Sequence, residues 1–248
     1  MITAQDILDN DPRLKVEINW DSTSRCIERG VWYGQHECVS ESAGLDDPSP
    51  VNPGQAIIKH QLTPEHSAHY SVLNFGFIAM HCYGFPHSTM TQITRHRDSA
   101  FLVQSGRYTG QRFVDVADGT KEVHQAFYFR PTGVYQDRQG KRYEYHSAEF
   151  MSDLMWCESA CYRYQEKISQ GFSEEHARAM LPYEFRQNFA IAGTVESVFH
   201  WLDQRSKKDS QLEIQAIAIL GLRCLKKATP NLGQWYEDNR YGKARLAP

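Results

Sequence analysis

An α+β domain, with an antiparallel sheet packed against a set of helices, is the fold class that this sequence predicts. Stretches in which apolar and polar residues alternate, typical of strands, lie before residue 147, and a helical pattern fills most of the chain after it. Strands followed by a run of helices are typical of an α+β domain rather than of alternating βαβ units. At 248 residues the chain can bury roughly 70–75% of its unfolded surface, which is sufficient for a single domain.

The N-terminal part of the chain is expected to be irregular. Residues 1–55 form an extension in this prediction, because three prolines and a glycine near its end indicate a loop. The domain itself is placed at residues 56–235 and is followed by a tail at 236–248. Near the start of the domain, Thr63 and Pro64 are typical of a helix N-cap and first turn.

The middle of the chain carries the first strand signal. The alternation of residues 70–80 favours a strand. A short helix should follow Pro86 and run into Arg95. On that helix Gln92, Arg95 and His96 share a face, because side chains three and four residues apart are neighbours.

A β-hairpin and a series of helices are predicted farther along the chain. Residues 126–129 indicate one strand, and residues 134–135 and 142–145 indicate a pair joined by a turn at 137–140. From Ser147 onward the pattern becomes helical. Four helices are expected, at 147–169, 173–181, 183–205 and 209–228.

The composition excludes several classes of protein. The formal net charge is −3, whereas a general nucleic-acid binder is usually basic overall. No apolar run could span a bilayer and no signal segment is seen, so a cytoplasmic protein without a membrane partner is expected. Cys157 and Cys161 lie one helical turn apart and should be reduced core residues. No metal site is expected, because His66 and His69 lack further ligands at suitable spacing.

The residues from Arg95 to Arg107 carry most of the functional information. The motif is Arg-His-Arg at 95–97, followed after seven residues by Ser105 and, one residue further, by Arg107. Three arginines and a histidine therefore accompany a Ser-Gly turn. Like charges at close range repel, which makes such a cluster costly unless an anion neutralises it. Arginine binds phosphate in a bidentate manner, and the amides around Ser105 and Gly106 add donors. The pattern predicts a phosphorylated ligand, although a solvated basic loop would also explain it in isolation.

This spacing resembles the signature of the flavin-dependent thymidylate synthases. Farther on, Arg178 stands three residues before Leu181-Pro182, and the segments 200–205 and 210–214 follow at the family's interval. The resemblance covers roughly residues 60–228. It implies the thymidylate synthase-complementing protein fold and the reductive methylation of dUMP to dTMP. Methylenetetrahydrofolate would donate the carbon, FAD would carry the hydride and NADPH would reduce it, in a homotetramer whose sites are shared between subunits.

The resemblance also implies which residues bind each ligand. Arg205 corresponds to the arginine at the uracil ring, where it would act in catalysis by stabilising negative charge. Ser105 is interpreted as a phosphate-binding hydroxyl, because no base in the motif is placed to deprotonate it. The expected dUMP contacts are Gln92, Ile93, Thr94, Arg95, Val103, Gln104, Ser105, Gly106, Arg107, Arg178 and Arg205. The expected flavin contacts are His69, Ser71, Arg95, His96, Arg97, Val103, Thr194, Val195, Glu196 and His200.

Four positions depart from the commoner family pattern. Asn74 stands where an acidic residue is frequent, and Val103 replaces a typical glutamate within the signature. Thr194 and Glu196 replace a typical asparagine and arginine. With Glu196 in place of that arginine, the chain would lack a cation near the phosphate or adenine end of the flavin. These differences affect individual flavin contacts rather than the reaction class.

Two other functions are compatible with parts of the sequence. The departures at Val103 and Glu196 leave room for flavin-dependent hydroxymethylation of a pyrimidine nucleotide, which the mass of the product would reveal. A non-enzymatic nucleic-acid module could use residues 95–97 as a phosphate clamp. Such a module would bind no flavin and would depend steeply on salt. The acidic net charge argues against it.

Overall fold

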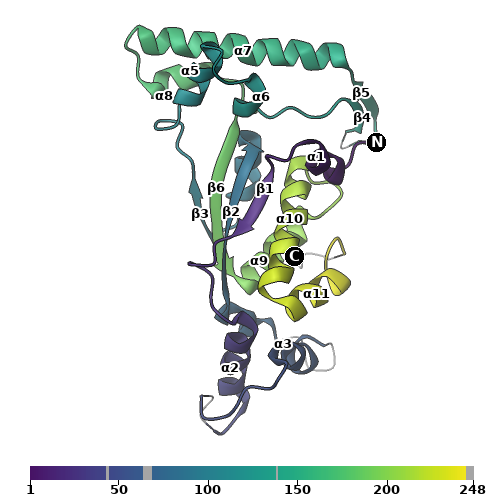
Figure 1. The fold of residues 1–248 in the computed structure, drawn as a ribbon. Helices are drawn as coiled ribbons and strands as arrows, with labels where there is room; N and C mark the ends of the chain where they lie inside the picture. Colours follow the sequence, from purple (N-terminus) through teal and green to yellow (C-terminus); the bar gives the residue numbers. More distant parts are fainter. Residues whose placement is uncertain (43–44, 64–68, 138, 244–248) are drawn as a thin grey trace. The chain divides into compact units, whose positions relative to one another are not determined.

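The strands in the described part of the chain form one four-stranded sheet and one separate hairpin. The computed structural model describes residues 1–42, 45–63, 69–137 and 139–243. Mixed helices and strands confirm the predicted α+β class (Figure 1). The larger sheet has the order β1-β2-β6-β3, with β1 at Lys15–Ile18, β2 at Phe77–Pro86, β3 at Ser99–Val103 and β6 at Arg186–Thr194. The hairpin pairs β4 (Gly133–Gln136) with β5 (Arg142–Tyr145) in antiparallel fashion.

The chain divides into two compact units, each built from three segments. The first unit comprises residues 1–15, 83–95 and 102–189, and the second comprises 16–82, 96–101 and the chain from 190 onward. Each strand of the larger sheet contributes residues to both units. The two units are described separately below.

The first unit is built around its longest helix, α7 (Ser147–Ser169). Three shorter helices lie beneath α7 in Figure 1 and pack against it: α5 (Gln111–Ala117), α6 (Val123–Ala126) and α8 (Glu174–Ala177). Their shared core includes Phe113, Phe127, Cys161 and Tyr164. The unit also contains α1 (Ala4–Asn10), α4 (Met90–Ile93) and the 3-10 turns His87–Thr89 and Arg178–Met180.

The second unit contains the C-terminal helices α9 (Val195–Arg205), α10 (Leu212–Ala228) and α11 (Pro230–Asn239). Helix α10 packs against both of the others, and Phe199, Trp201 and Tyr236 are fully buried in this core. Among its described residues, the unit also contains α2 (Ile27–Val39), α3 (Pro53–Ile57), the π-helix Ile58–Leu62 and the 3-10 helix Tyr70–Phe75.

Several predicted elements are confirmed. Helix α7 has the predicted bounds, and the β4–β5 hairpin lies where the alternation placed it. The helix expected after Pro86 is present as a 3-10 turn followed by α4. The Cys157 and Cys161 thiols are buried and free.

Other predicted elements are wrong. The helix predicted at 183–205 is strand β6, which pairs between β2 and β3, followed by α9. Ala190 and Ala192 on the half-exposed side of β6 are apolar, and they hide the alternation that is typical of a strand. The strand predicted at 126–129 is the end of α6 and a single bridge from Phe127 to Phe185. Likewise, residues 70–75 form a 3-10 helix, and the strand begins only at Phe77.

The N-terminal extension is not irregular. Residues 1–55 include α1, β1 and α2, and Thr3 caps α1 with a reciprocal hydrogen bond to Asp6. At the other end, α11 continues to Asn239, past the predicted domain end at 235. The helix start at Pro64 and the histidine pair that includes His66 lie outside the described residues. None of the helices within the described ranges has the length and apolar character needed to cross a bilayer.

Candidate active site

The segment that follows β3 is held in place through Gln104. Its N–H donates to the carbonyl of Asn188 at 2.9 Å, and its own carbonyl accepts from Nε2 of Gln187 at 2.7 Å. The side-chain Oε1 of Gln104 accepts from Nη1 of Arg112 at 3.1 Å. Gln104 therefore anchors the loop that leads to Arg107, and its predicted nucleotide contact competes with the bond to Arg112.

The loop itself places a hydroxyl, backbone amides and two guanidinium groups together. The Oγ atom of Ser105 accepts from the N–H of Arg107 at 3.2 Å. A Cβ atom added at Gly106 would lie 3.5 Å from Cδ of Arg178, so this arginine packs against the loop backbone. Nε of Arg107 lies 3.0 Å from Oε1 of Glu175, and both side chains are about half exposed. The structure thus brings together Ser105, Gly106, Arg107 and Arg178, as the sequence predicts.

Two further residues near this loop belong to no motif. His87 stacks on Phe185 with ring centroids 4.6 Å apart, and the pKa of His87 is lowered by burial and then by the charges of Arg178 and Arg112. Burial also lowers the pKa of Arg112 to about 10. Within the described part of the chain, Nε and Nη2 of Arg112 and Nδ1 of His87 are buried without a hydrogen-bond partner. Arg112 therefore adds to the positive charge that the sequence predicts at this loop, and neither Arg112 nor His87 was predicted as a site residue.

The predicted nucleotide contacts on and after α4 differ in their accessibility. Arg95 is exposed, and Val103 is 38% exposed. Ile93 is fully buried, so any nucleotide contact there would involve only its backbone. The Thr94 hydroxyl donates to a backbone carbonyl of its own helix at 2.6 Å. Gln92 is half-buried.

In the second unit, the histidine of the Arg-His-Arg motif binds the predicted catalytic arginine. Nε of Arg205 donates to Nε2 of His96 at 2.8 Å, which requires a neutral ring with its proton on Nδ1. Burial, followed by the charges of Arg205 and His200, lowers the pKa of His96 to about 4, while Asp98 opposes the shift. The ring of His200 lies edge-on to that of His96, with centroids 6.0 Å apart. His96 is only 4% exposed, so little of this predicted flavin residue is open to contact with a ligand.

Two other predicted flavin residues of the second unit, His69 and Ser71, are hydrogen-bonded to each other. The hydroxyl of Ser71 lies 2.8 Å from Nε2 of His69, and both residues are exposed. Arg97 is also exposed. Most of the predicted flavin residues belong to the second unit, and Arg95 and Val103 belong to the first. Most of the predicted nucleotide residues belong to the first unit, and Arg205 belongs to the second.

Three of the four residues that depart from the family pattern, Asn74, Thr194 and Glu196, are linked by hydrogen bonds. The Asn74 amide donates to the carboxylate of Glu196, and its oxygen accepts from the Thr194 hydroxyl at 2.9 Å. Thr194 is also the N-cap of α9. Val195 is fully buried and its N–H donates to Gly76 at 2.9 Å, so a flavin contact at this position could use only its carbonyl.

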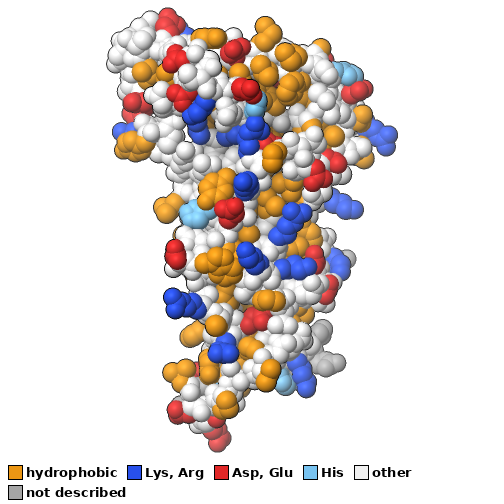
Figure 2. Space-filling model, in the orientation of Figure 1, with side chains coloured by type: hydrophobic (Ala, Val, Ile, Leu, Met, Phe, Trp, Pro, Cys, Tyr) orange, Lys and Arg blue, Asp and Glu red, His pale blue; other side chains and the backbone are white. Residues whose placement is uncertain are grey.

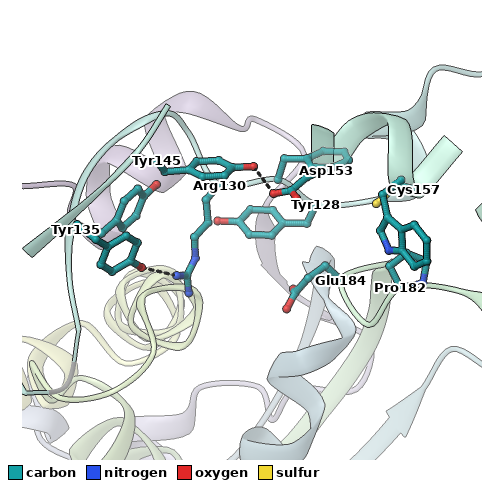
Figure 3. Close-up of a pocket in the computed structure, with 11 residues that line it drawn as sticks. Tyr128, Arg130, Tyr135, Tyr145, Asp153, Cys157, Pro182 and Glu184 are labelled. Carbon is teal, nitrogen blue, oxygen red and sulfur yellow. Dashed lines mark hydrogen bonds between the residues drawn. The ribbon is translucent and has the colours of Figure 1, made fainter. Parts of the chain in front are cut away.

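A cavity of about 470 Å³ lies in the first unit (Figure 3). Six aromatic side chains form most of its wall: Tyr128, Phe129, Tyr135, Tyr143, Tyr145 and Trp156. Arg130, Asp153 and Glu184 also line it. None of these residues was predicted to bind the nucleotide or the flavin, and the sequence signal that could have found them is the concentration of aromatic residues between 127 and 145.

Known proteins resemble this chain along most of its length. The family model described as thymidylate synthase complementing protein matches residues 29–231, and so begins inside the predicted extension. A flavin-dependent thymidylate synthase of Haloarcula marismortui is 29% identical over 224 residues, which cover 87% of this chain and 88% of that protein. The corresponding protein of Corynebacterium efficiens is 24% identical, with 87% and 82% covered.

Two solved structures share the fold. Thymidylate synthase X from Helicobacter pylori, with FAD and dUMP, has a TM-score of 0.67 at 14% identity and covers 91% of this chain and 98% of its own. The UMP/dUMP methylase PolB from Streptomyces cacaoi, bound with 5-Br dUMP, has a TM-score of 0.73 at 19% identity, with 93% and 97% covered. Because the family match spans most of the sequence, the chain belongs to the thymidylate synthase complementing proteins, the family of the flavin-dependent thymidylate synthases.

Proposed function

We propose that this protein methylates dUMP to dTMP, with methylenetetrahydrofolate as the carbon donor and FAD, reduced by NADPH, as the hydride carrier. The observation that carries the proposal is the Ser105–Arg107 loop with Arg178 packed against Gly106. Family membership supports the reaction class, and the relative from Helicobacter pylori was solved with FAD and dUMP. A cytoplasmic location, where nucleotide precursors and reduced pyridine nucleotides are found, is part of the proposal.

The nucleotide phosphate is assigned to the loop of the first unit. Arg107 and Arg178 offer guanidinium groups, and the amides around Gly106 offer further donors. Burial and then the charges of Arg178 and Arg112 lower the pKa of His87, and the same two charges attract an anionic ligand at this loop. A phosphate dianion is therefore favoured, and it would draw Arg107 away from its half-exposed partner Glu175.

The base is assigned to Arg205. A guanidinium beside N3 and the adjacent carbonyl of uracil stabilises negative charge on the ring and makes C5 more nucleophilic. His96 holds Nε of this arginine at 2.8 Å and so limits its orientation. An enzyme thiol is not required for this activation, and burial raises the pKa of Cys157 and Cys161 to about 12, far from a useful nucleophile.

The flavin is assigned to the exposed polar groups of the second unit. His69 and Ser71 present an imidazole and a hydroxyl at the surface, and Thr194 caps the N-terminal end of α9. These groups fit a cofactor with many hydrogen-bonding atoms, whereas Glu196 does not favour a phosphate beside it. When bound, FAD supplies the hydride. The residues of the chain hold and orient it and exclude water.

We include in the proposal a homotetramer whose sites are shared between subunits. Met151, Met155 and Tyr162 are 52%, 62% and 51% exposed and lie along one face of α7, opposite the buried Tyr164. Apolar side chains gather in the upper part of Figure 2, where α7 runs in Figure 1. Exposed apolar side chains on one face of a helix suit a subunit interface. Light scattering during size-exclusion chromatography should report four times the chain mass of 28.6 kDa.

A visible absorption spectrum followed by anaerobic reduction tests the reaction. Purified or FAD-reconstituted protein should show flavin bands at roughly 370 and 450 nm, a property of the cofactor itself. NADPH should bleach them faster with dUMP present, and mass spectrometry should find dTMP after addition of methylenetetrahydrofolate. A protein that cannot be reconstituted with FAD, or a product heavier than dTMP by one oxygen, would overturn the proposal.

Arg107→Ala provides a variant test of the phosphate assignment. Loss of a charge-assisted hydrogen bond costs about 1.5–3 kcal/mol, so dUMP binding should weaken by roughly 10–150-fold while FAD binding is unchanged. Arg163→Ala is the matched control, because Arg163 is an exposed arginine of α7 paired with Glu166. Equal losses of dUMP and FAD binding would identify Arg107 as a structural residue.

A further inference from the structure

The aromatic cavity of the first unit has the size and composition of a ligand site. Its volume of about 470 Å³ falls within the range of small-molecule pockets, roughly 300–1,000 Å³. Its walls come from the β4–β5 hairpin, from α7 and from the segments 128–130 and 182–184. Trp156 is 65% exposed and Tyr143 is 43% exposed, so the cavity presents large aromatic faces to solvent. Such faces are costly to leave in water and favour a flat, stacking ligand.

The charged groups of the cavity restrict the charge of that ligand. Asp153 and Glu184 bring two carboxylates, while Arg130 brings one guanidinium (Figure 3). The two carboxylates would repel a polyphosphate, because both groups are negatively charged. An ammonium ligand is also disfavoured, because the guanidinium of Arg130 already lies over the Tyr135 ring at 5.7 Å. A neutral ligand therefore fits best.

The carboxylate of Asp153 defines which edge of the ligand is recognised. Tyr145 donates to one oxygen of Asp153 at 2.7 Å, which fixes the carboxylate at the cavity wall (Figure 3). Asp153 and Trp156 lie three residues apart on α7 and share a face of the helix. A ring stacked on Trp156 can therefore direct an edge with adjacent N–H and NH₂ donors toward a carboxylate acceptor.

We propose that this cavity binds a neutral heteroaromatic ring with a 2-amino-4-oxopyrimidine edge, stacked against Trp156 and hydrogen-bonded to Asp153. Pterins and guanine nucleosides share this edge. The folate co-substrate of the proposed reaction is a pterin, so a pterin ligand would link the cavity to that reaction, and this link alone rests on the proposed function. A guanine ligand would make the cavity an independent site.

Calorimetric titration of the flavin-loaded protein with 6-hydroxymethylpterin, guanosine and GTP tests the proposal. One pterin or one guanosine should bind per chain, and GTP should bind more weakly than guanosine. Asp153→Asn keeps an acceptor for Tyr145 but removes the charge, and should weaken binding at least tenfold. Glu149→Gln, in the first turn of the same helix and outside the cavity, should leave affinity unchanged. Trp156→Ala should also weaken binding, whereas Trp156→Phe should largely retain it.

The outcomes distinguish a pterin from a guanine nucleoside as the ligand. They also test the cavity separately from the proposed methylation of dUMP. Saturable binding of the pterin alone assigns the cavity to folates, and binding of guanosine alone assigns it to nucleosides. Absence of binding by both, tighter binding of GTP, or binding unchanged in both Asp153→Asn and Trp156→Ala would overturn the inference. Because the readout is binding and not turnover, it remains decisive even if the protein makes no dTMP. Conversely, dTMP formation by a protein with an empty cavity would leave the proposed reaction intact.

Discussion

Protonation of His96 is the perturbation that most directly tests how Arg205 is held. Nε2 of His96 accepts from Arg205 at 2.8 Å, and an imidazolium ring has no acceptor to offer. Burial and the neighbouring charges lower the pKa of this ring from 6.5 to about 4. The neutral ring is therefore the form that the fold requires, and the bond to Arg205 should persist until the pH approaches 4.

The sign and size of the effect on stability follow from the same pKa values. In the unfolded chain His96 takes up its proton near pH 6.5, whereas the folded chain resists protonation until about pH 4. The stabilisation is complete above pH 6.5 and is lost as the pH falls from 6.5 to about 4. The full difference corresponds to at most about 3 kcal/mol. Solvent near the exposed His200 and the half-buried Arg205 screens part of it, so we expect about 1–2 kcal/mol.

Urea unfolding at about pH 7.5 and pH 5 measures this contribution. The wild-type free energy of unfolding should fall by about 1–2 kcal/mol more between these pH values than that of His96→Gln, which cannot titrate. The glutamine still offers an oxygen to Arg205, so its flavin content should be normal. His146→Gln is the control, because His146 is an exposed histidine. If His96→Gln retained the wild-type pH dependence, His96 would not be the group that acid protonates, and the reasoning would fail.

Three other predictions concern the first unit. Asp11→Ala should lower the free energy of unfolding by about 3–5 kcal/mol in urea titrations, because it leaves the buried guanidinium of Arg186 without its ionic partner. Gly110→Ala would place a Cβ atom 1.9 Å from the hydroxyl oxygen of Tyr164 and should cost about 1–3 kcal/mol. Tyr164→Phe in the same chain should recover part of that loss, and no recovery would locate the strain elsewhere. Cys161, whose pKa burial raises to about 12, should resist thiol reagents at pH 8 unless the protein is unfolded.

The elements that the sequence predicts well are those whose pattern is local. Helix α7 was located to its end residues because 23 residues with helical periodicity are bounded by their own start and stop signals. Strand β6 was not recognised, although its buried residues alternate with half-exposed ones from Gln187 onward. The half-exposed Ala190 and Ala192 are themselves apolar, so residues 189–192 read as an apolar run that also suits a helix.

The same distinction applies to the candidate site. Family resemblance predicted Arg107 and Arg178, and the structure places Arg178 against the glycine next to Arg107. His87 and Arg112 could not be predicted, because their effect depends on burial around Phe185, which no spacing in the sequence encodes. The sequence also presents His96 as a candidate flavin contact. Only the structure shows that His96 is buried and hydrogen-bonded to Arg205.

The side chains of Asn74, Thr194 and Glu196, three of the departures from the family pattern, form one hydrogen-bonded network. An aspartate at position 74 would face the Glu196 carboxylate, and two like charges at hydrogen-bond distance repel each other. An amide resolves this conflict, because it donates to Glu196 and accepts from Thr194 at the same time. Thr194 in turn accepts from the Ser197 N–H at 3.1 Å and so caps α9. The negative charge at position 196 is therefore supported by its neighbours, and the start of α9 is stabilised without the arginine that is frequent there.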